Sequence, residues 1–236
     1  MPEFDCSRNV ILAADPAKVW EAVATGEGNA GWLFPTEIDP TGAGATAWDP
    51  PARFRMLQQQ GEWFNDIDFV IEDRGDGTSA LRYVHRGVFP QEGFDAQNDA
   101  VQQHTDFYLH TLGEYVAHFS GRTATYIGEV PGGIQGPAGS ATPDGFRRLR
   151  HALGLGDRLS AGDQVRLTPD GLEPIEGVVD YLRPNFMGIR TADALYCLFG
   201  RNAFGAPVAL TIHAFDGRDP EQAERDWQQF LDGAVA

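Results

Sequence analysis

The sequence predicts an α+β fold in which an antiparallel sheet curls around a long C-terminal helix, and it predicts this unit in tandem. The segments Gly77–His85 and Gly205–His213 each read as a strand that ends in histidine, and each precedes a helix with an aromatic-rich apolar stripe. Both halves have the order strand, helix, several strands, helix. The 236 residues have room for two domains. We expect them at residues 1–122 and 123–236.

The first elements follow from capping and turn signals. Residues 8–14 read as a strand. Asp15 and Pro16 then start a helix, because Asp caps helices well and proline is tolerated at the first helical position. Pro50 and Pro51 indicate a turn after a strand, because tandem prolines cannot continue a central ladder.

A hairpin over residues 63–86 is predicted by alternation and by the Gly/Asp turn at residues 73–78. Arg82 and Arg86 fall on the face away from the core, with Asp66 and Asp68. The opposite face is apolar, and we expect it to be concave. It carries Trp63, Asn65, Ile67, Phe69 and Ile71 from one strand, and Leu81, Tyr83 and His85 from the other.

Residues 100–119 have the three-four spacing of a long amphipathic helix that packs on a sheet, and Gly121 ends it. Its apolar stripe contains Val101, Thr105, Tyr108, Leu109, Leu112, Tyr115, Val116 and Phe119.

The second half repeats the plan after a Gly/Pro-rich loop at residues 131–140. A helix opens at Thr142 and ends at Gly154. Short strands are predicted at residues 164–168, 176–182, 186–190, 194–199 and 208–215. Asp219 caps a final helix that buries Trp227.

Several of these segments together resemble the SRPBCC superfamily with its START-like helix-grip fold, in the branch named after the activator of heat-shock-protein ATPase. The resemblance covers residues 5–122. It is carried by Val19–Val23, Gly31–Trp32, Trp48–Phe54, Leu81–Gly87 and Phe107–Tyr115. The second half resembles a diverged copy, in which residues 176–181 are similar to the strand before Trp48.

The resemblance implies a sheet that grips a helix over an apolar cavity. Relatives bind lipids, sterols, polyketides or plant hormones, and a few act as cyclases or chaperone partners. This sequence departs from the family between residues 36 and 46, where only eleven residues replace an additional pair of strands. We therefore expect a shortened first sheet and an open or incomplete cavity.

Charge and composition limit the classes of molecule that this protein is expected to bind. Eighteen basic against thirty-four acidic residues give a net charge of −16, a field that repels nucleic acids and anionic membranes. Cys6 and Cys197 form no CxxC motif, which favours a reducing cytoplasm. No apolar run approaches the ~18 residues of a membrane span. One lysine beside seventeen arginines, with abundant Ala and Gly, indicates a bacterial source.

No catalytic motif is present, and we expect no cofactor. The chain contains no Gly-x-Ser-x-Gly elbow and no phosphate loop in its usual context. Asp106, His110 and Glu114 share a helix face with the spacing of metal ligands. That face opposes the apolar stripe, so we interpret it as solvated and expect no metal site.

The sequence predicts a binding protein for a small hydrophobic molecule, apolar or aromatic. Two alternatives remain: an aromatase/cyclase-type enzyme in which His85 or Tyr83 moves a proton, and a chaperone-associated module with a protein partner or a homodimer. Trp32 could line a pocket together with Trp63, Tyr83 and Tyr108. Plain core packing of these aromatic residues, and a histidine bonded to backbone at the sheet rim, also fit the pattern. The predicted ligand-binding residues are Trp63, Asn65, Ile67, Phe69, Tyr83, His85 and Tyr108, with Asn65, Tyr83 and His85 setting the orientation.

Overall fold

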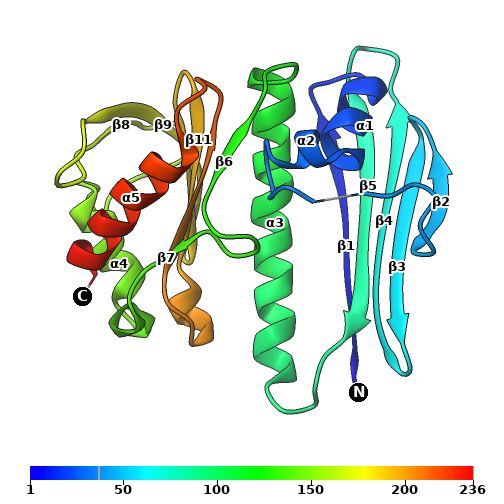
Figure 1. The fold of residues 1–236 in the computed structure, drawn as a ribbon, viewed down its shortest axis with the longest axis horizontal. Helices are drawn as coiled ribbons and strands as arrows, with labels where there is room; N and C mark the ends of the chain where they lie inside the picture. Colours follow the sequence, from blue (N-terminus) through cyan, green and yellow to red (C-terminus); the bar gives the residue numbers. More distant parts are fainter. Residues whose placement is uncertain (37, 236) are drawn as a thin grey trace. The chain divides into compact units, whose positions relative to one another are not determined.

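Each half of the chain contains one antiparallel sheet and the helices that cover it (Figure 1). The structure is a computed structural model that describes residues 1–36 and 38–235. It divides into two units, Met1–Gly121 and Arg122–Ala236.

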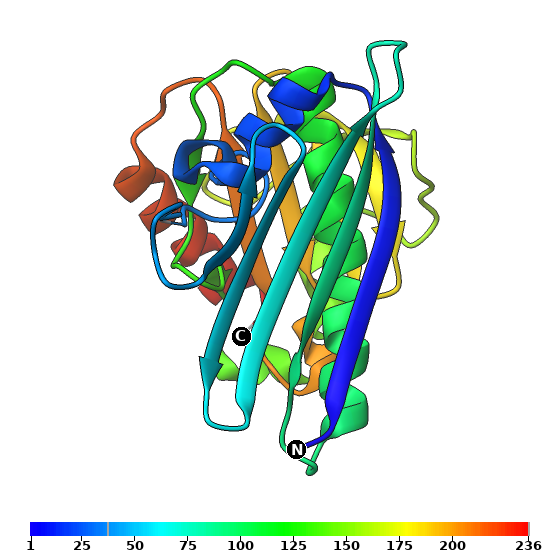
Figure 2. The same ribbon diagram turned by 90° about the vertical axis from the view of Figure 1, so that its right-hand side faces the viewer.

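The first unit has five strands in the order β1-β5-β4-β3-β2, and all neighbours are antiparallel. The first strand therefore pairs with the last one before the long helix. Within this unit, α3 runs along one face of the sheet (Figures 1 and 2). The elements are β1 (Glu3–Leu12), α1 (Pro16–Ala24), α2 (Gly26–Asn29), β2 (Ala45–Asp49), β3 (Arg53–Gln60), β4 (Trp63–Asp73), β5 (Ser79–Val88) and α3 (Phe94–His118).

The capping and turn signals act as predicted. The Asp15 carboxylate accepts a hydrogen bond from the Lys18 backbone N–H at 3.0 Å, and Pro16 occupies the first turn of α1. The tandem prolines separate β2 from β3. Helix α3 begins at Phe94, earlier than the apolar stripe indicated, because its first turns are polar and Gly93 precedes them with a φ of 74°.

Strand β3 was not predicted, because its alternation is short. Phe54 is buried on the concave face, but the strand ends in three consecutive glutamines that hide the period of two. The structure contains no strand between α2 and β2 in the residues that it describes there.

The convex face of the first sheet is covered by paired charges. Asp66 and Asp68 are 5% and 4% exposed although they point away from the apolar face. Arg55 donates two hydrogen bonds to Asp66, at 2.7 and 2.8 Å, and Arg53 donates two to Asp68, at 3.0 and 2.9 Å. The Arg55 guanidinium lowers the pKa of Asp66. These bidentate pairs explain how carboxylates remain charged under so little water.

The second unit follows the same path with one more strand at its end. Its sheet order is β6-β12-β11-β10-β9-β8, and β7 also pairs with β12. The elements are β6 (Thr125–Ile127), β7 (Ile134–Gln135), α4 (Gly145–Ala152), β8 (Gln164–Leu167), β9 (Ile175–Arg183), β10 (Phe186–Arg190), β11 (Ala194–Phe199), β12 (Ala209–Ala214) and α5 (Pro220–Ala234), with short 3-10 helices at Ala138–Ala141 and Arg201–Phe204.

The common strand path confirms the predicted tandem helix-grip fold. In both units the first strand pairs with the last, and the sheet then continues outward in reverse order of the chain. Strand β9 occupies the position of β2, as the resemblance of residues 176–181 implied. The predicted loop at residues 131–140 does contain the two-residue strand β7, which is too short to give a pattern.

The equivalence of the two histidines is wrong in one respect. Ile212 belongs to the core under α5, so His213, the next residue of β12, faces the other side of its sheet. His85 instead shares the concave face with Tyr83. When the two sheets are compared by their buried faces, the two similar segments are therefore offset by one residue.

Within the described residues, no helix combines the length and the apolar character that a membrane crossing requires.

Candidate functional site

A row of aromatic side chains crosses the concave face of the first sheet. Trp48, Phe54, Phe69 and Tyr83 are directly opposite one another on four neighbouring strands, and Arg8 ends the row on β1. The Phe54 and Phe69 rings are stacked with centroids 4.6 Å apart, and Tyr83 meets Phe69 edge-on at 5.0 Å. The row forms a continuous aromatic floor, because cross-strand neighbours lie close on one face.

A cavity of about 430 Å³ lies above this floor. The sheet supplies its base, α3 supplies one wall, and α1, α2 and the segment after them supply the other. Within this unit, Figure 1 shows α1 and α2 between α3 and one end of the sheet. The lining consists of Val23, Asn29, Trp32, Leu33, Phe34, Thr36, Ile38, Phe54, Met56, Gln58, Asn65, Ile67, Phe69, Tyr83, Thr105, Tyr108 and Leu109.

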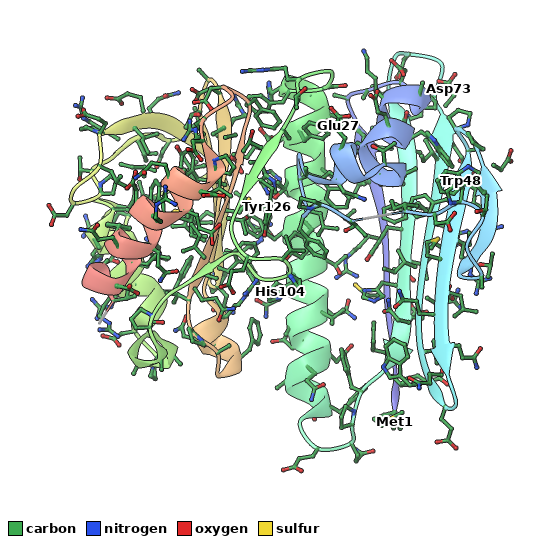
Figure 3. The ribbon with its side chains drawn as sticks, viewed as in Figure 1. Met1, Glu27, Trp48, Asp73, His104 and Tyr126 are labelled. Carbon is green, nitrogen blue, oxygen red and sulfur yellow. The ribbon has the colours of Figure 1, made fainter. Side chains whose placement is uncertain are left out.

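The cavity opens toward the tip of the β3–β4 hairpin. Phe54 and Phe69 are buried, the next pair Met56 and Ile67 is half-buried, and Gln58 is exposed. Figure 3 labels the two ends of this unit: Asp73 lies at the end with α1 and α2, and Met1 lies at the opposite end, where the hairpin tip lies. The cavity is therefore most open beside Gln58 and more deeply buried at the aromatic row.

The described lining residues carry no formal charge. They include no Asp, Glu, Lys, Arg or His, although the whole chain has a net charge of −16. The polar groups in the lining are amides and hydroxyls. Moving a charged group from water into such surroundings costs free energy, because nothing there neutralises the charge. Moving a neutral apolar molecule from water into them is favourable.

His85 lies beside the cavity and positions Asn65. The two side chains meet with 2.7 Å between His85 Nε2 and Asn65 Oδ1, so Nε2 carries the proton and donates to the amide oxygen. The His85 ring also packs edge-on against Phe4, at 5.0 Å between centroids. Burial lowers the pKa of His85 to about 4, so the ring is neutral near pH 7.

A second polar group sits deeper in the same cavity. The Thr105 side chain on α3 interacts with Tyr83 and Cys6, where it partly offsets the effect of burial on the pKa of each group. Burial raises the pKa of Tyr83 and that of the Cys6 thiol. Both groups therefore stay protonated near neutral pH, and Tyr83 presents a neutral phenol to the cavity.

Five of the seven predicted ligand-binding residues line this cavity, namely Asn65, Ile67, Phe69, Tyr83 and Tyr108. His85 lies behind Asn65 instead. Trp63 points to the same face but is 41% exposed, because it lies at the hairpin tip beyond the lining.

Sequence reasoning missed the wall formed by α1, α2 and the segment that follows. Trp32 was considered only as one of several aromatic residues that could line a pocket, and Phe34 lies outside any periodic pattern, so the sequence did not show that either residue covers the sheet. The Trp32 indole N–H donates to the Ala22 carbonyl at 2.9 Å, and this bond fixes the wall against α1. A lone Trp after a Gly-rich turn was the one available sign.

Asp106, His110 and Glu114, which have the spacing of metal ligands, each lie beside another titratable side chain. Among the described residues, no group of three or more His, Cys, Asp or Glu side chains is arranged to hold a metal ion. Asp106 pairs with Arg8, and Glu114 lies 4.0 Å from His110 and 3.6 Å from His118.

The second unit has a filled core where the first has the cavity. The corresponding row, Val179, Ile189, Tyr196 and Ile212, is fully buried. Trp227 of α5 packs on Tyr196, with 5.6 Å between ring centroids. A hollow of about 480 Å³ lies beside Tyr196 and Trp227, but its lining contains charged residues, Arg218 among them.

Strand order and helix placement define the chain as a helix-grip protein in tandem, and solved structures of this kind are similar to it. The di-domain ARO/CYC BexL from the BE-7585A biosynthetic pathway is 13% identical, with a TM-score of 0.43 over 100% of this chain and 99% of that one. The Aha1 dimer from Colwellia psychrerythraea is 17% identical, with a TM-score of 0.38 over 48% of this chain and 95% of that one.

The AHSA1-like protein of Rhizobium etli is 19% identical, with a TM-score of 0.36, and covers 51% of this chain and 84% of its own. No family model and no curated protein matches the chain. The fold that the sequence motifs implied is supported by the strand paths of the two sheets described above.

Proposed function

We propose that the first unit binds a small, uncharged, largely aromatic or apolar molecule in the cavity between its sheet and α3. The observation that carries this proposal is the lining: an aromatic floor under a cavity that opens at one end, without a charged side chain among the described residues. The volume of about 430 Å³ falls within the range of ordinary small-molecule sites.

Buried apolar area supplies most of the affinity in this proposal, at ~25 cal/mol per Å² before the costs of association. The hydroxyls and amides then set the orientation of the ligand. Tyr83, Asn65 and Thr105 reach the cavity from different elements, so they act on different parts of a bound molecule.

The two alternative functions gain no support from particular residues. A cyclase needs a group that exchanges protons near pH 7, but the pKa of His85 is about 4 and that of Tyr83 is raised. A chaperone-associated module needs a contiguous apolar surface. The large exposed hydrophobic residues among those described come from separate parts of the sequence, namely Met1, Ile11, Trp63 and Val130. The expected bacterial source and cytoplasmic location rest on the sequence alone.

Two fluorescent probes with one skeleton test the proposal. N-phenyl-1-naphthylamine is neutral, and 1-anilinonaphthalene-8-sulfonate adds a fixed negative charge. We expect the full chain to bind the neutral probe and to bind the sulfonate much more weakly, because no described lining residue can neutralise it.

A matched pair of variants locates the binding. Ile67→Trp adds bulk to the cavity floor, and Val70→Trp adds the same bulk on the opposite face of β4. Loss of the neutral probe in Ile67→Trp and its retention in Val70→Trp are expected. Equal binding by both variants, or no binding by the unaltered protein, would refute the proposed function.

A further inference from the structure

We propose that the cavity holds an amphipathic molecule in one orientation. Its apolar ring system lies on the aromatic row, and a neutral group that accepts hydrogen bonds, such as a ketone or amide carbonyl, lies at the open end beside Gln58 and Asn65. This inference rests on the proposed function and adds the polarity and orientation of the ligand. It is drawn from the order in which three pairs of side chains follow one another along the floor.

The floor changes from aromatic to polar in a single direction. Three cross-strand pairs of β3 and β4 lie two residues apart on one face, and all of them line the cavity: Phe54 with Phe69, Met56 with Ile67, and Gln58 with Asn65. The first pair is buried, the second is half-buried, and Gln58 of the third is exposed. At ~3.3 Å per residue, the first and third pairs are about 13 Å apart. A fused-ring molecule with one polar end reaches from the aromatic pair to the amide pair.

The two amides at the open end are close enough to bind the same ligand group. Directly opposed residues on one face of an antiparallel pair have Cβ atoms about 4.5 to 5.5 Å apart. Gln58 and Asn65 form such a pair, and both line the cavity. The Gln58 side chain makes no hydrogen bond to the described part of the chain, so its amide is available to a ligand.

His85 determines which half of the Asn65 amide is available. His85 Nε2 donates to the Asn65 oxygen at 2.7 Å, which leaves the Asn65 NH2 group for a ligand. The imidazole is itself held in place, because Phe4 packs edge-on against it with 5.0 Å between ring centroids. A Cβ at Gly87, the residue opposite Asn65 on β5, would lie 2.7 Å from the Phe4 ring, so this ring covers Gly87 closely. His85 is therefore a positioning residue that acts on the ligand through Asn65.

This arrangement selects an acceptor without a charge. The Asn65 NH2 group donates, and the Gln58 amide can turn its own NH2 group toward the same atom. A carbonyl oxygen has two lone pairs and accepts from both, whereas neither amide neutralises an anion. Among the lining residues that come from the sheet, Tyr83 is the other polar one, and its side chain interacts with Thr105. The polar end of a ligand therefore gains more at the open end than at the aromatic row.

Three naphthalenes that differ in one substituent test the inference. 2-Acetylnaphthalene carries a carbonyl acceptor, 2-isopropenylnaphthalene has the same shape without the acceptor, and 2-naphthoate carries a charge. Each competes with N-phenyl-1-naphthylamine for the full-length protein. The quantity measured is the ratio of the affinity of the ketone to that of the hydrocarbon. Comparing this ratio between protein variants cancels the difference in the transfer of the two ligands from water.

Single variants assign the preference to the two amides. Gln58→Leu and Asn65→Leu should each lower the ratio about two- to tenfold, the effect of losing one net hydrogen bond. Gln59→Leu is the matched control and should leave the ratio unchanged, because the next residue of β3 is also exposed but faces the other side of the sheet. Retained binding of N-phenyl-1-naphthylamine shows that each variant is folded.

A double-variant cycle tests the positioning by His85. His85→Phe keeps a ring against Phe4 but cannot donate to Asn65. It should lower the ratio about as much as Asn65→Leu does, and the two changes together should lower it no further than Asn65→Leu alone. Additive effects of the two changes would contradict the positioning role, because a purely structural effect of His85 does not depend on Asn65.

The outcomes separate this inference from the proposed function. An unchanged ratio in both Gln58→Leu and Asn65→Leu, with N-phenyl-1-naphthylamine still bound, would overturn the inference and leave the proposed function standing. Tighter binding of 2-naphthoate than of the ketone would also overturn it, because the open end would then accept an anion. If no neutral probe binds to the unaltered protein, the proposed function fails and this inference fails with it.

Discussion

His85 shows how one residue can be correctly located from sequence and still have a different part in the site. The alternation of β5 placed it on the concave face, where it lies. The spacing of residues did not show that its ring would bond to Asn65 rather than face a ligand, because that depends on a cross-strand diagonal between β4 and β5. Asn29 had no sequence signal at all, since a single Asn in a short Gly-rich helix fits a turn equally well.

The buried imidazole predicts a pH dependence of stability. Its pKa in the folded protein is about 4, below the ordinary value of 6.5. As the pH falls below 6.5, the unfolded chain takes up this proton before the folded one does, so folding weakens until about pH 4. The loss reaches about 3 kcal/mol at most.

Urea unfolding at pH 7 and pH 4.5 measures this effect. His85→Gln keeps a polar side chain but cannot titrate, so its stability should fall much less between the two pH values. Asp66 contributes little in this window, because its pKa is lowered and its charge is lost only at more acidic pH. Parallel losses in both proteins would show that His85 does not control the dependence.

At the scale of elements, long segments with a regular hydrophobic period were predictable from the sequence, and segments that are short or whose period is interrupted were not. β4 and the strands from β9 to β12 follow the predicted ranges closely, because their alternation or apolar runs are unbroken. β7 has two residues, and the end of β3 is polar, so neither carries a pattern. The two histidine segments were aligned one residue out of register with respect to the buried face of their strands. Similar sequences alone do not determine which face of a strand is buried.

Helix α3 should depend on its buried leucine. Leu112 is completely buried on the stripe that faces the sheet. Leu112→Ala should destabilise the first unit by about 2 to 5 kcal/mol, because it removes apolar contacts and leaves a cavity. Ile11→Ala, at a position of β1 that is 56% exposed, should cost less than about 1 kcal/mol. Similar values for the two variants in denaturant melts would place Leu112 outside the core.

The ion pairs on the convex face of the first sheet should stabilise the folded protein more than solvent-exposed ion pairs do. Asp66→Asn leaves the Arg55 guanidinium without its bidentate partner, and we expect a loss of about 1 to 3 kcal/mol. Glu176→Gln breaks a cross-strand pair with Arg166 in which both side chains are more than half exposed, so less than about 1 kcal/mol is expected. Chemical denaturation of both variants decides whether burial strengthens these pairs.

At the scale of the whole molecule, one fold is used in two ways. The first unit leaves a cavity between sheet and helix, whereas the second fills that space with Trp227, Phe230 and Leu231. The sequence predicted the two sheets and their helices, but it did not predict this difference, because both helices carry aromatic stripes. Whether such a stripe leaves a void depends on the side chains that meet it.

We propose that the two units are separate domains, and their division tests this. Residues 1–121 and 122–236, produced separately, should each show cooperative thermal unfolding by circular dichroism. Only the first should bind N-phenyl-1-naphthylamine, since the second lacks a corresponding cavity among its described residues. Binding by the second fragment alone would contradict the assignment of the site.

The described cavity lining is uncharged, whereas the chain as a whole is acidic. This difference bears on how fast small molecules reach the cavity as well as on how tightly they would bind there. The first 122 residues carry eight basic against nineteen acidic side chains, so the first unit as a whole has a negative potential. Anions are slowed during their diffusional approach, within a Debye length of roughly 8 Å at physiological salt, before they meet the cavity. Under the proposed function, neutral molecules would approach unhindered, so the cavity would select its ligand by rate as well as by affinity, and a change in ionic strength would alter only the rate at which anions arrive.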